Sequence, residues 1–223
     1  RSELAPGEHH CRELGALLAR MHLAARDFPR IQPNLRGLAW WNETAPVVMP
    51  HLDERQAALP AMEAIHATTG ETVFLCVRRG DEAVCIERLD GKRVQSLELR
   101  LGGSLPMHRG AAPRTLLAFS PDEAIDAYVA GGSLEKGGEP RMSRRDLLRD
   151  VEEIREQGYA ISDEDVTPGI AAIGAPLFDY RSDVRAALSI SGTKPAILGD
   201  REKMIELVLD AASRASRVLG YES

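Results

Sequence analysis

Ser189 and Ser191 are the side chains with the clearest potential for binding chemistry in this sequence. They lie two residues apart in a run expected to form a β-strand, and alternate side chains of a strand point to the same face. Both hydroxyls can therefore donate to one cluster of ligand oxygens, which suits a carboxylate. The alternative is a strand whose serines face solvent while Leu188 and Ile190 face the core.

A second group of candidates lies between residues 108 and 114. Arg109 or Arg114 could hold a carboxylate through a bidentate pair, although an arginine at a helix start is commonly only solvated. Pro113 indicates that a helix begins just before it. For His108 we favour a hydrogen-bonded structural role over a catalytic one.

Catalytic chemistry is not indicated by any motif. The sequence has no Ser-His-Asp, metal-ligand or nucleotide-loop pattern at usable spacing, so we expect no enzyme activity, no metal and no cofactor. Cys11, Cys76 and Cys85 lack CxxC spacing, and the last two lie in apolar, strand-like runs. They are interpreted as buried free thiols, which predicts a reducing, cytoplasmic compartment and argues against a cysteine nucleophile.

The elements that must position these residues are short strands and longer helices. Runs of β-branched and apolar residues predict strands, with hairpin turns at 79–81 and 179–183. The predicted strands are 73–77, 83–86, 94–99, 171–178 and 184–190.

Helices are indicated by apolar spacing and by capping signals. Ser120-Pro121-Asp122-Glu123 has the pattern of a capping box, and Ser143 with Asp146 repeats it. Further helices are expected at 9–25, from about 53 to Gly70, and from about 204 to Gly220. Hairpins flanked by helices, without a regular βαβ alternation, predict an α+β fold with a mostly antiparallel sheet.

Length and charge narrow the class of protein. A chain of 223 residues has room for one main domain and an appendage. Its net charge of -6 argues against a strongly basic face for nucleic acid. No run approaches 18 apolar residues, so no membrane partner is expected. The first residue is Arg, which suggests a truncated or processed N-terminus.

Several short motifs recur along the chain from residue 69 onward. They are TGETV at 69–73, RLGGSLPMH at 100–108, REQGY at 155–159, DED at 163–165, PG at 168–169 and LSISG at 188–192. Together, in order and spacing, they resemble the effector-binding domain of IclR-type transcriptional regulators, over residues 59–223. The resemblance implies a GAF-like α+β fold with a small-metabolite pocket, and association into a homodimer or homotetramer.

The resemblance also implies which residues form the pocket. Backbone N–H groups of Ala111 and Ala112 would hold an anion at a helix N-terminus, although these residues could equally begin a buried helix. Ser162 stands where some relatives have an acidic ligand contact, and Ala172 where some have a thiol, so the pocket floor is less polar here. An anionic ligand with an apolar body is expected. The implied set is Ala111, Ala112, Ser162, Ala172, Ser189 and Ser191, with an apolar wall of Val94, Leu97 and Leu105 that could equally be ordinary core.

The first 58 residues do not follow this pattern. Residues 9–58 are similar to a stretch of the phosphotransferase-type homoserine kinases, through LGALLARMHLA at 14–24 and NLRGLAWW at 34–41. No glycine-rich loop and no His-x-Asp with a following Asn accompany them, so the segment cannot phosphorylate a substrate by itself. We expect an N-terminal segment at 1–58 that is a fusion remnant, a rearrangement or a misjoined sequence.

The sequence thus predicts a sensing domain for a small organic carboxylate in an IclR-type regulator. DNA would be reached only through a winged helix-turn-helix that is not visible in this chain. Two alternatives stay open: a dimerisation module without a ligand, and an enzyme fragment. The pocket pattern argues against the first, and the missing catalytic motifs argue against the second.

Overall fold

The computed structural model describes residues 52–92, 99–132, 134 and 142–222. These residues form six strands and six helices. The strands are β1 (Thr72–Arg79), β2 (Glu82–Leu89), β3 (Ser104–Pro106), β4 (Ala160–Asp163), β5 (Ile170–Phe178) and β6 (Val184–Thr193). The helices are α3 (Leu52–Thr69), α4 (Ala111–Ala118), α5 (Asp122–Ala130), α6 (Arg144–Gln157), α7 (Lys194–Leu198) and α8 (Arg201–Val218).

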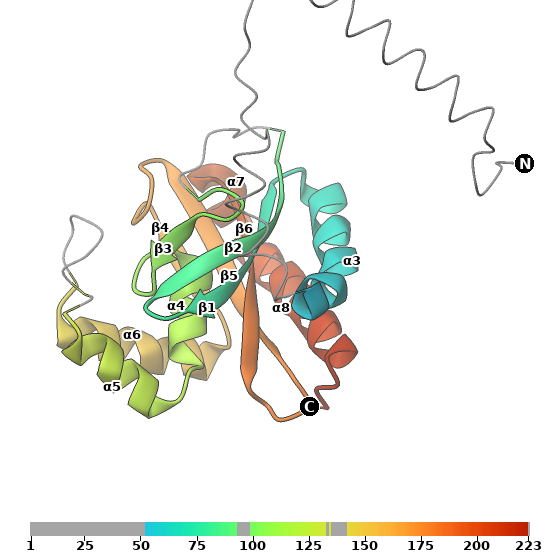
Figure 1. Cartoon of the computed structure of the whole chain (residues 1–223). Helices are drawn as coiled ribbons and strands as arrows, with labels where there is room; N and C mark the ends of the chain where they lie inside the picture. Colours follow the sequence, from blue (N-terminus) through green and yellow to red (C-terminus); the bar gives the residue numbers. More distant parts are fainter. Residues whose placement is uncertain (1–51, 93–98, 133, 135–141, 223) are drawn as a thin grey trace, which may run out of the picture. The chain divides into compact units, whose positions relative to one another are not determined.

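All six strands belong to one antiparallel sheet in the order β3-β2-β1-β6-β5-β4 (Figure 1). Two hairpins account for most of it. β1 and β2 are joined by a tight turn at Gly80, whose φ of 62° suits glycine. β5 and β6 are joined through 179–183, where Asp179 accepts hydrogen bonds from the N–H groups of Arg181 and Asp183. Both predicted hairpins and the α+β class are confirmed.

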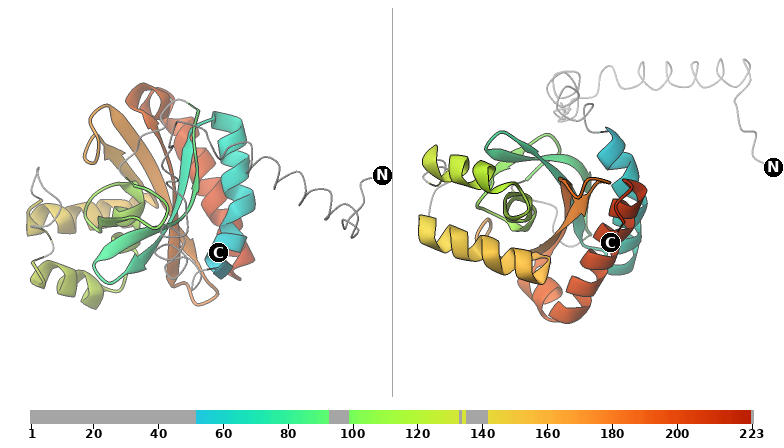
Figure 2. Two further views of the ribbon diagram at one scale, coloured as in Figure 1. Left: turned by 45° about the horizontal axis from the view of Figure 1, so that its top comes forward. Right: turned by 90° about the horizontal axis from the view of Figure 1, so that it is seen from below.

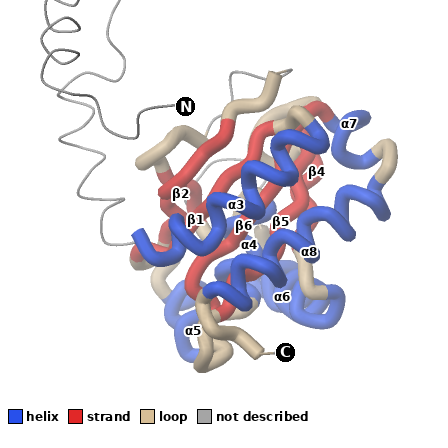
Figure 3. The backbone as a smooth tube through the Cα atoms, turned by 90° about the vertical axis from the view of Figure 1, so that its right-hand side faces the viewer, coloured by secondary structure: helices blue, strands red, loops and turns tan. Residues whose placement is uncertain are grey.

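Helices cover both faces of this sheet (Figures 1 and 2). Helices α3 and α8 lie side by side on one face, as Figure 3 shows. On the other face α4 packs against β1, β5 and β6, and α6 packs on α4. Because both faces are covered, the central strands β1 and β6 are apolar along most of their length rather than alternating with polar residues.

The two faces of the central strands supply two separate apolar clusters. In β1, Val73, Leu75 and Val77 face α3 and α8, whereas Phe74 and Cys76 face α4. Strand β6 divides in the same way. Its Ala186, Leu188 and Ile190 pack toward α3 and α8, so the residues between them face the α4 layer.

Helix α3 packs on the sheet through Ala58, Ala61, Met62 and Ile65, which are spaced three and four residues apart and buried. It ends at Gly70, where the chain adopts a φ of 71°. The predicted stop is therefore confirmed, and the helix runs without interruption through positions 58 and 59.

One of the two predicted capping signals is confirmed and one is wrong. The Ser143 hydroxyl accepts a hydrogen bond from the N–H of Asp146 at 3.1 Å and begins α6. Ser120 does not cap α5, because its buried hydroxyl donates to the carbonyl of Leu116 at 2.7 Å. Pro121 is the residue before α5 and makes no side-chain cap. The hydroxyl of Ser120 is therefore bonded to the end of the preceding helix, because serine hydroxyls commonly donate to the carbonyl four residues earlier in the chain.

The remaining differences concern short elements. Strands β3 and β4 and helix α7 have three to five residues each and were not predicted. Of the strand predicted at 94–99, residues 94–98 lie outside the described residues and Leu99 is not in a strand. The predicted helix at 9–25 also lies outside them.

Candidate functional site

A cavity that is partly open to solvent lies between the start of α4, the sheet and the loop that joins β4 to β5, and its empty volume, including the open part, is about 480 Å³. Its lining combines apolar side chains with hydroxyl groups and with the backbone at the start of α4. The lining residues are Phe74, Leu99, Leu105, Gly110, Ala111, Ala112, Pro113, Ser162, Val166, Thr167, Ile170, Ala172, Ser189 and Ser191. None of these side chains is charged.

The structure brings together seven of the nine residues that the sequence suggested. Val94 and Leu97 lie outside the described residues. The seven are Leu105, Ala111, Ala112, Ser162, Ala172, Ser189 and Ser191. Phe74 and Ile170 were missed, although the alternation of β1 places Phe74 on the same face as Cys76 and could have suggested it. Val166 and Thr167 come from a loop, and no pattern in the sequence marks them.

Ser189 lines the cavity close to the start of α4. It is 4% exposed, and within the described residues its hydroxyl has no hydrogen-bond partner. Ser191 is 6% exposed and donates to the carbonyl of Ala171 at 3.3 Å. The alternative that these serines face solvent is wrong, because Leu188 and Ile190 fill one face of β6 while the serines are buried on the other. The Ser189 hydroxyl lines the cavity and is free to hydrogen-bond a group placed there.

Helix α4 begins directly over this hydroxyl. Gly174 pairs with Ser189 across β5 and β6, and its missing side chain lets the helix approach. A Cβ atom on Gly174 would lie 2.9 Å from the carbonyl carbon of Ala111 and 3.0 Å from the nitrogen of Ala112. In the part of the chain that the structure describes, no acceptor receives the N–H groups of Ala111 and Ala112. The free N–H groups and the helix dipole favour an anion or a polarised oxygen here.

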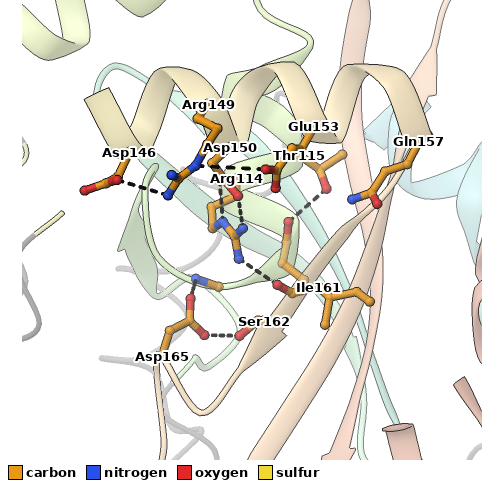
Figure 4. Close-up of polar contacts among 12 residues, drawn as sticks. Arg114, Thr115, Asp146, Arg149, Asp150, Glu153, Gln157, Ile161, Ser162 and Asp165 are labelled. Carbon is orange, nitrogen blue, oxygen red and sulfur yellow. Dashed lines mark hydrogen bonds and ion pairs between the residues drawn. The ribbon is translucent and has the colours of Figure 1, made fainter. Parts of the chain in front are cut away.

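The Asp165 carboxylate accepts a hydrogen bond from a further backbone N–H group at the same helix end (Figure 4). Its Oδ2 accepts a hydrogen bond from the N–H of Gly110 at 2.9 Å, and its Oδ1 accepts one from the Ser162 hydroxyl. The Arg109 guanidinium donates to the backbone carbonyl of Asp165 at 2.9 Å. Asp165 is therefore hydrogen-bonded to two residues that line the cavity, without lining it itself. The sequence showed Asp163, Glu164 and Asp165 as an acidic run but gave no sign of this pairing.

Arg114 does not point into the cavity. Its guanidinium makes a bidentate pair with Asp150 of α6 and donates to the carbonyl of Ile161 at 2.7 Å (Figure 4). Burial alone would lower the pKa of Arg114, but the hydrogen bond and charge of Asp150 raise it. Arg114 thus forms the bidentate pair that was considered for a ligand carboxylate, but its partner is Asp150 of the protein itself. Neither Arg109 nor Arg114 lines the cavity, so the interpretation of these arginines as ligand contacts is wrong.

His108 is a structural residue, as the sequence suggested. Its Nδ1 lies 2.6 Å from the hydroxyl of Tyr128, and both side chains are buried. Burial, reinforced by the positive charge of Arg109, lowers the pKa of His108, and burial raises that of Tyr128 to about 12. The pair is therefore neutral at ordinary pH.

Cys76 and Cys85 face each other across β1 and β2 and are fully buried free thiols. The hydrogen bond with Cys76 and burial raise the pKa of Cys85, which disfavours a reactive thiolate. Among the described residues no group of three His, Cys, Asp or Glu side chains could hold a metal ion. Within the same residues, no helix combines the length and apolarity needed to cross a membrane.

The N-terminal part of the chain has its own relatives. The homoserine kinase of Cupriavidus metallidurans is 55% identical over 67 residues, which are 30% of this chain and 20% of the kinase. The predicted resemblance to these kinases is thus confirmed as a short, partial match. It spans too little of the kinase to indicate the kinase activity.

The larger part of the chain matches transcriptional regulators. The family described as "Bacterial transcriptional regulator IclR C-terminal" matches residues 47–217. The HTH-type transcriptional regulator KipR of Bacillus subtilis is 34% identical over 181 residues, covering 80% of this chain and 72% of KipR. The transcriptional repressor AllR of Escherichia coli K12 is 30% identical over 194 residues, 83% of this chain and 72% of AllR.

Solved structures agree with this assignment. The crystal structure of Thermotoga maritima IclR has a TM-score of 0.72 and 25% identity, and the match covers 98% of this chain and 94% of that one. With the matched sequence and the shared fold, the chain belongs to the IclR family of transcriptional regulators and carries its C-terminal, effector-binding domain.

Proposed function

We propose that the cavity binds a small organic carboxylate as the effector of this regulator. The observation that carries the proposal is that three donors without a partner among the described residues line one cavity, namely the N–H groups of Ala111 and Ala112 and the hydroxyl of Ser189. Ser191 adds a second hydroxyl nearby. Ala172 and Leu105 contribute to the apolar lining, so the ligand has one polar end and an apolar body.

The wider assignment follows from the same family. We propose that the chain is not an enzyme and that it acts in the cytoplasm as a homodimer or homotetramer. Its relatives are regulators, and its two described thiols are free and buried, which suits a reducing compartment. Contact with DNA is proposed to run through a winged helix-turn-helix outside the matched domain, because the chain itself is acidic.

The experiment that tests the cavity is a thermal-shift screen of small organic acids, each paired with its own primary amide. A ligand that binds only the folded state raises the melting temperature with concentration. We expect at least one acid to stabilise the chain and its amide to do so less.

Two serine variants locate the site. Ser189→Ala should reduce the shift, whereas Ser213→Ala on α8, on the opposite face of the sheet, should leave it unchanged. A shift of the same size in Ser189→Ala and in the unmodified chain would place the ligand elsewhere. The absence of any stabilising compound would favour a dimerisation role instead.

A further inference from the structure

Asp165 brings a negative charge to the end of the cavity where a ligand anion would sit. Its carboxylate accepts hydrogen bonds from Gly110 and Ser162, and both of these residues line the cavity. Gly110 is followed directly by Ala111 and Ala112, whose N–H groups are the unpartnered donors. A ligand carboxylate at those donors would therefore share the start of α4 with a carboxylate of the protein.

The two arginines near this helix end are engaged within the protein. Arg114 is engaged with Asp150, and Arg109 donates to the carbonyl oxygens of Asp165 and Val166. Neither arginine lines the cavity, and no charged side chain is among the lining residues that the structure describes. The donors that the described lining offers to a ligand are thus neutral N–H and hydroxyl groups.

The remaining lining cannot hold a second anion. Its side chains Phe74, Leu99, Leu105, Val166 and Ile170 are apolar and offer no hydrogen-bond donors. Placing an ionised carboxylate against such a surface removes its hydration without supplying donors. Placing it at the polar end instead would bring it toward Asp165, and like charges repel strongly where water is excluded.

We propose that Asp165 is a specificity-determining residue that restricts the cavity to ligands with a single negative charge. The proposal rests on the proposed function and adds the charge class of the effector. Ser189 is the second feature that points to a ligand, because its buried hydroxyl faces the same end without a partner. Asp165 acts by charge from behind Ser162 and Gly110, without itself lining the cavity.

The loop that carries Asp165 is fixed, so its charge stays in place. Lys194 pairs with Asp163 at 2.8 Å and with Glu164 at 2.9 Å, and Glu164 accepts the N–H of Gly169 at 3.0 Å. The hydrogen bonds from Arg109 hold the same loop from the side of α4. The Asp165 carboxylate consequently acts on a ligand from a defined position behind the lining.

The test compares succinate with succinamate, which has nearly the same shape but one carboxylate replaced by an amide. Titration calorimetry on the unmodified chain at pH 7.5 should show succinamate binding at least tenfold more tightly than succinate. This comparison needs no variant, so it decides the proposal even if a substitution at Asp165 does not fold.

Two variants then assign the selectivity to Asp165. Asp165→Asn keeps an oxygen that can accept from Gly110 but removes the charge, and it should reduce the preference for succinamate to threefold or less. Asp163→Asn is the matched control. It removes one negative charge two residues away, on a half-exposed side chain that faces Lys194, and should keep the tenfold preference.

Three results would overturn the proposal: similar affinities for the two probes, a preference that persists in Asp165→Asn, or no binding of succinamate. In each case the proposed function is judged separately. An acid from the thermal-shift screen whose effect is lost in Ser189→Ala would show that the cavity binds an effector whose charge Asp165 does not select.

Discussion

Gly174 lies so close beneath Ala111 that any side chain on it would meet the backbone of α4. A Cβ atom there would lie 2.9 Å from the Ala111 carbonyl carbon, a separation that real Cβ atoms essentially never show. The contact sets the distance between the helix start and Ser189, which pairs with Gly174 in the sheet.

Gly174→Ala should therefore push α4 away from the sheet. We expect a loss of about 1 to 3 kcal/mol in the free energy of unfolding, the usual cost of forcing extra volume into a packed interior. Urea denaturation measures it. Ligand affinity should fall as well, because the Ala111 and Ala112 donors move away from Ser189. Unchanged stability would mean that α4 is not held against the sheet at this point.

Ser189→Ala should weaken a carboxylate ligand by roughly 0.5 to 3 kcal/mol, the range for losing one hydrogen bond to a neutral or charged partner. Calorimetric titration of a ligand identified in the acid screen gives this value. Ser191→Ala should have a smaller effect, since its hydroxyl already donates to Ala171. The unfolding midpoint should not fall in Ser189→Ala, because no described residue depends on that hydroxyl. Equal affinity in both variants and the unmodified chain would contradict the assignment.

The pair of His108 and Tyr128 predicts a dependence of stability on pH. The pKa of His108 is lowered in the folded state, so the unfolded chain takes up a proton first as the pH falls. The contribution of His108 to the free energy of unfolding is then present above the ordinary histidine pKa of about 6.5 and is lost as the pH falls below it. The pKa of Tyr128 is raised to about 12, so its contribution is present below the ordinary tyrosine value and lost as the pH rises through about 12.

Thermal unfolding between pH 7.5 and pH 5 tests the histidine part. The decrease in melting temperature should be smaller in His108→Gln than in the unmodified chain. At pH 7.5, Tyr128→Phe should cost roughly 1 to 3 kcal/mol, because it leaves the Nδ1 atom of His108 buried without its partner. An identical pH profile in His108→Gln would assign the effect to other groups.

The boundary between the N-terminal segment at 1–58 and the sensor domain at 59–223 stays a prediction. Helix α3 crosses this boundary, and its first turns bury Glu54, Ala57 and Ala58, with Glu54 paired to Arg185 at 2.7 Å. A chain that begins at residue 47 should unfold at the same temperature as the whole chain. A chain that begins at 59 should lose several degrees, because the apolar surface under these turns is exposed. Loss of folding in the first truncation would show that residues 1–46 are part of the domain's packing.

Much of the fold was predictable because its signals are local. The turn at Gly80, the cap at Ser143 and the stop at Gly70 each act within a few residues, and the apolar runs of β5 and β6 are long enough to show a pattern. Elements of three to five residues, such as β3 and α7, are too short for any periodicity to appear. The capping pattern at Ser120 failed because a carbonyl of the preceding helix competed for the same hydroxyl.

The candidate site was predictable only in part, for a related reason. Ser189 and Ser191 share a strand face by local geometry. By contrast, Asp165 meets Gly110 across 55 residues of chain, and Arg114 meets Asp150 across 36. Which carboxylate an arginine or a helix end receives depends on tertiary packing. The sequence therefore identified groups that could form hydrogen bonds with a ligand, but it could not show which of the neighbouring groups are already paired within the protein.

Strand β6 carries Ser189 and Ser191 toward the cavity and Leu188 and Ile190 toward α3 and α8, on one continuous backbone. A backbone shift that brings Ser189 closer to a ligand must carry its two neighbours with it. The packing on the far side then has to readjust, and α3 is the helix that leads back toward the N-terminal residues. We therefore expect strand β6 to couple the two layers mechanically, so that occupancy of the cavity would alter the packing of α3 and α8 on the other side of the sheet.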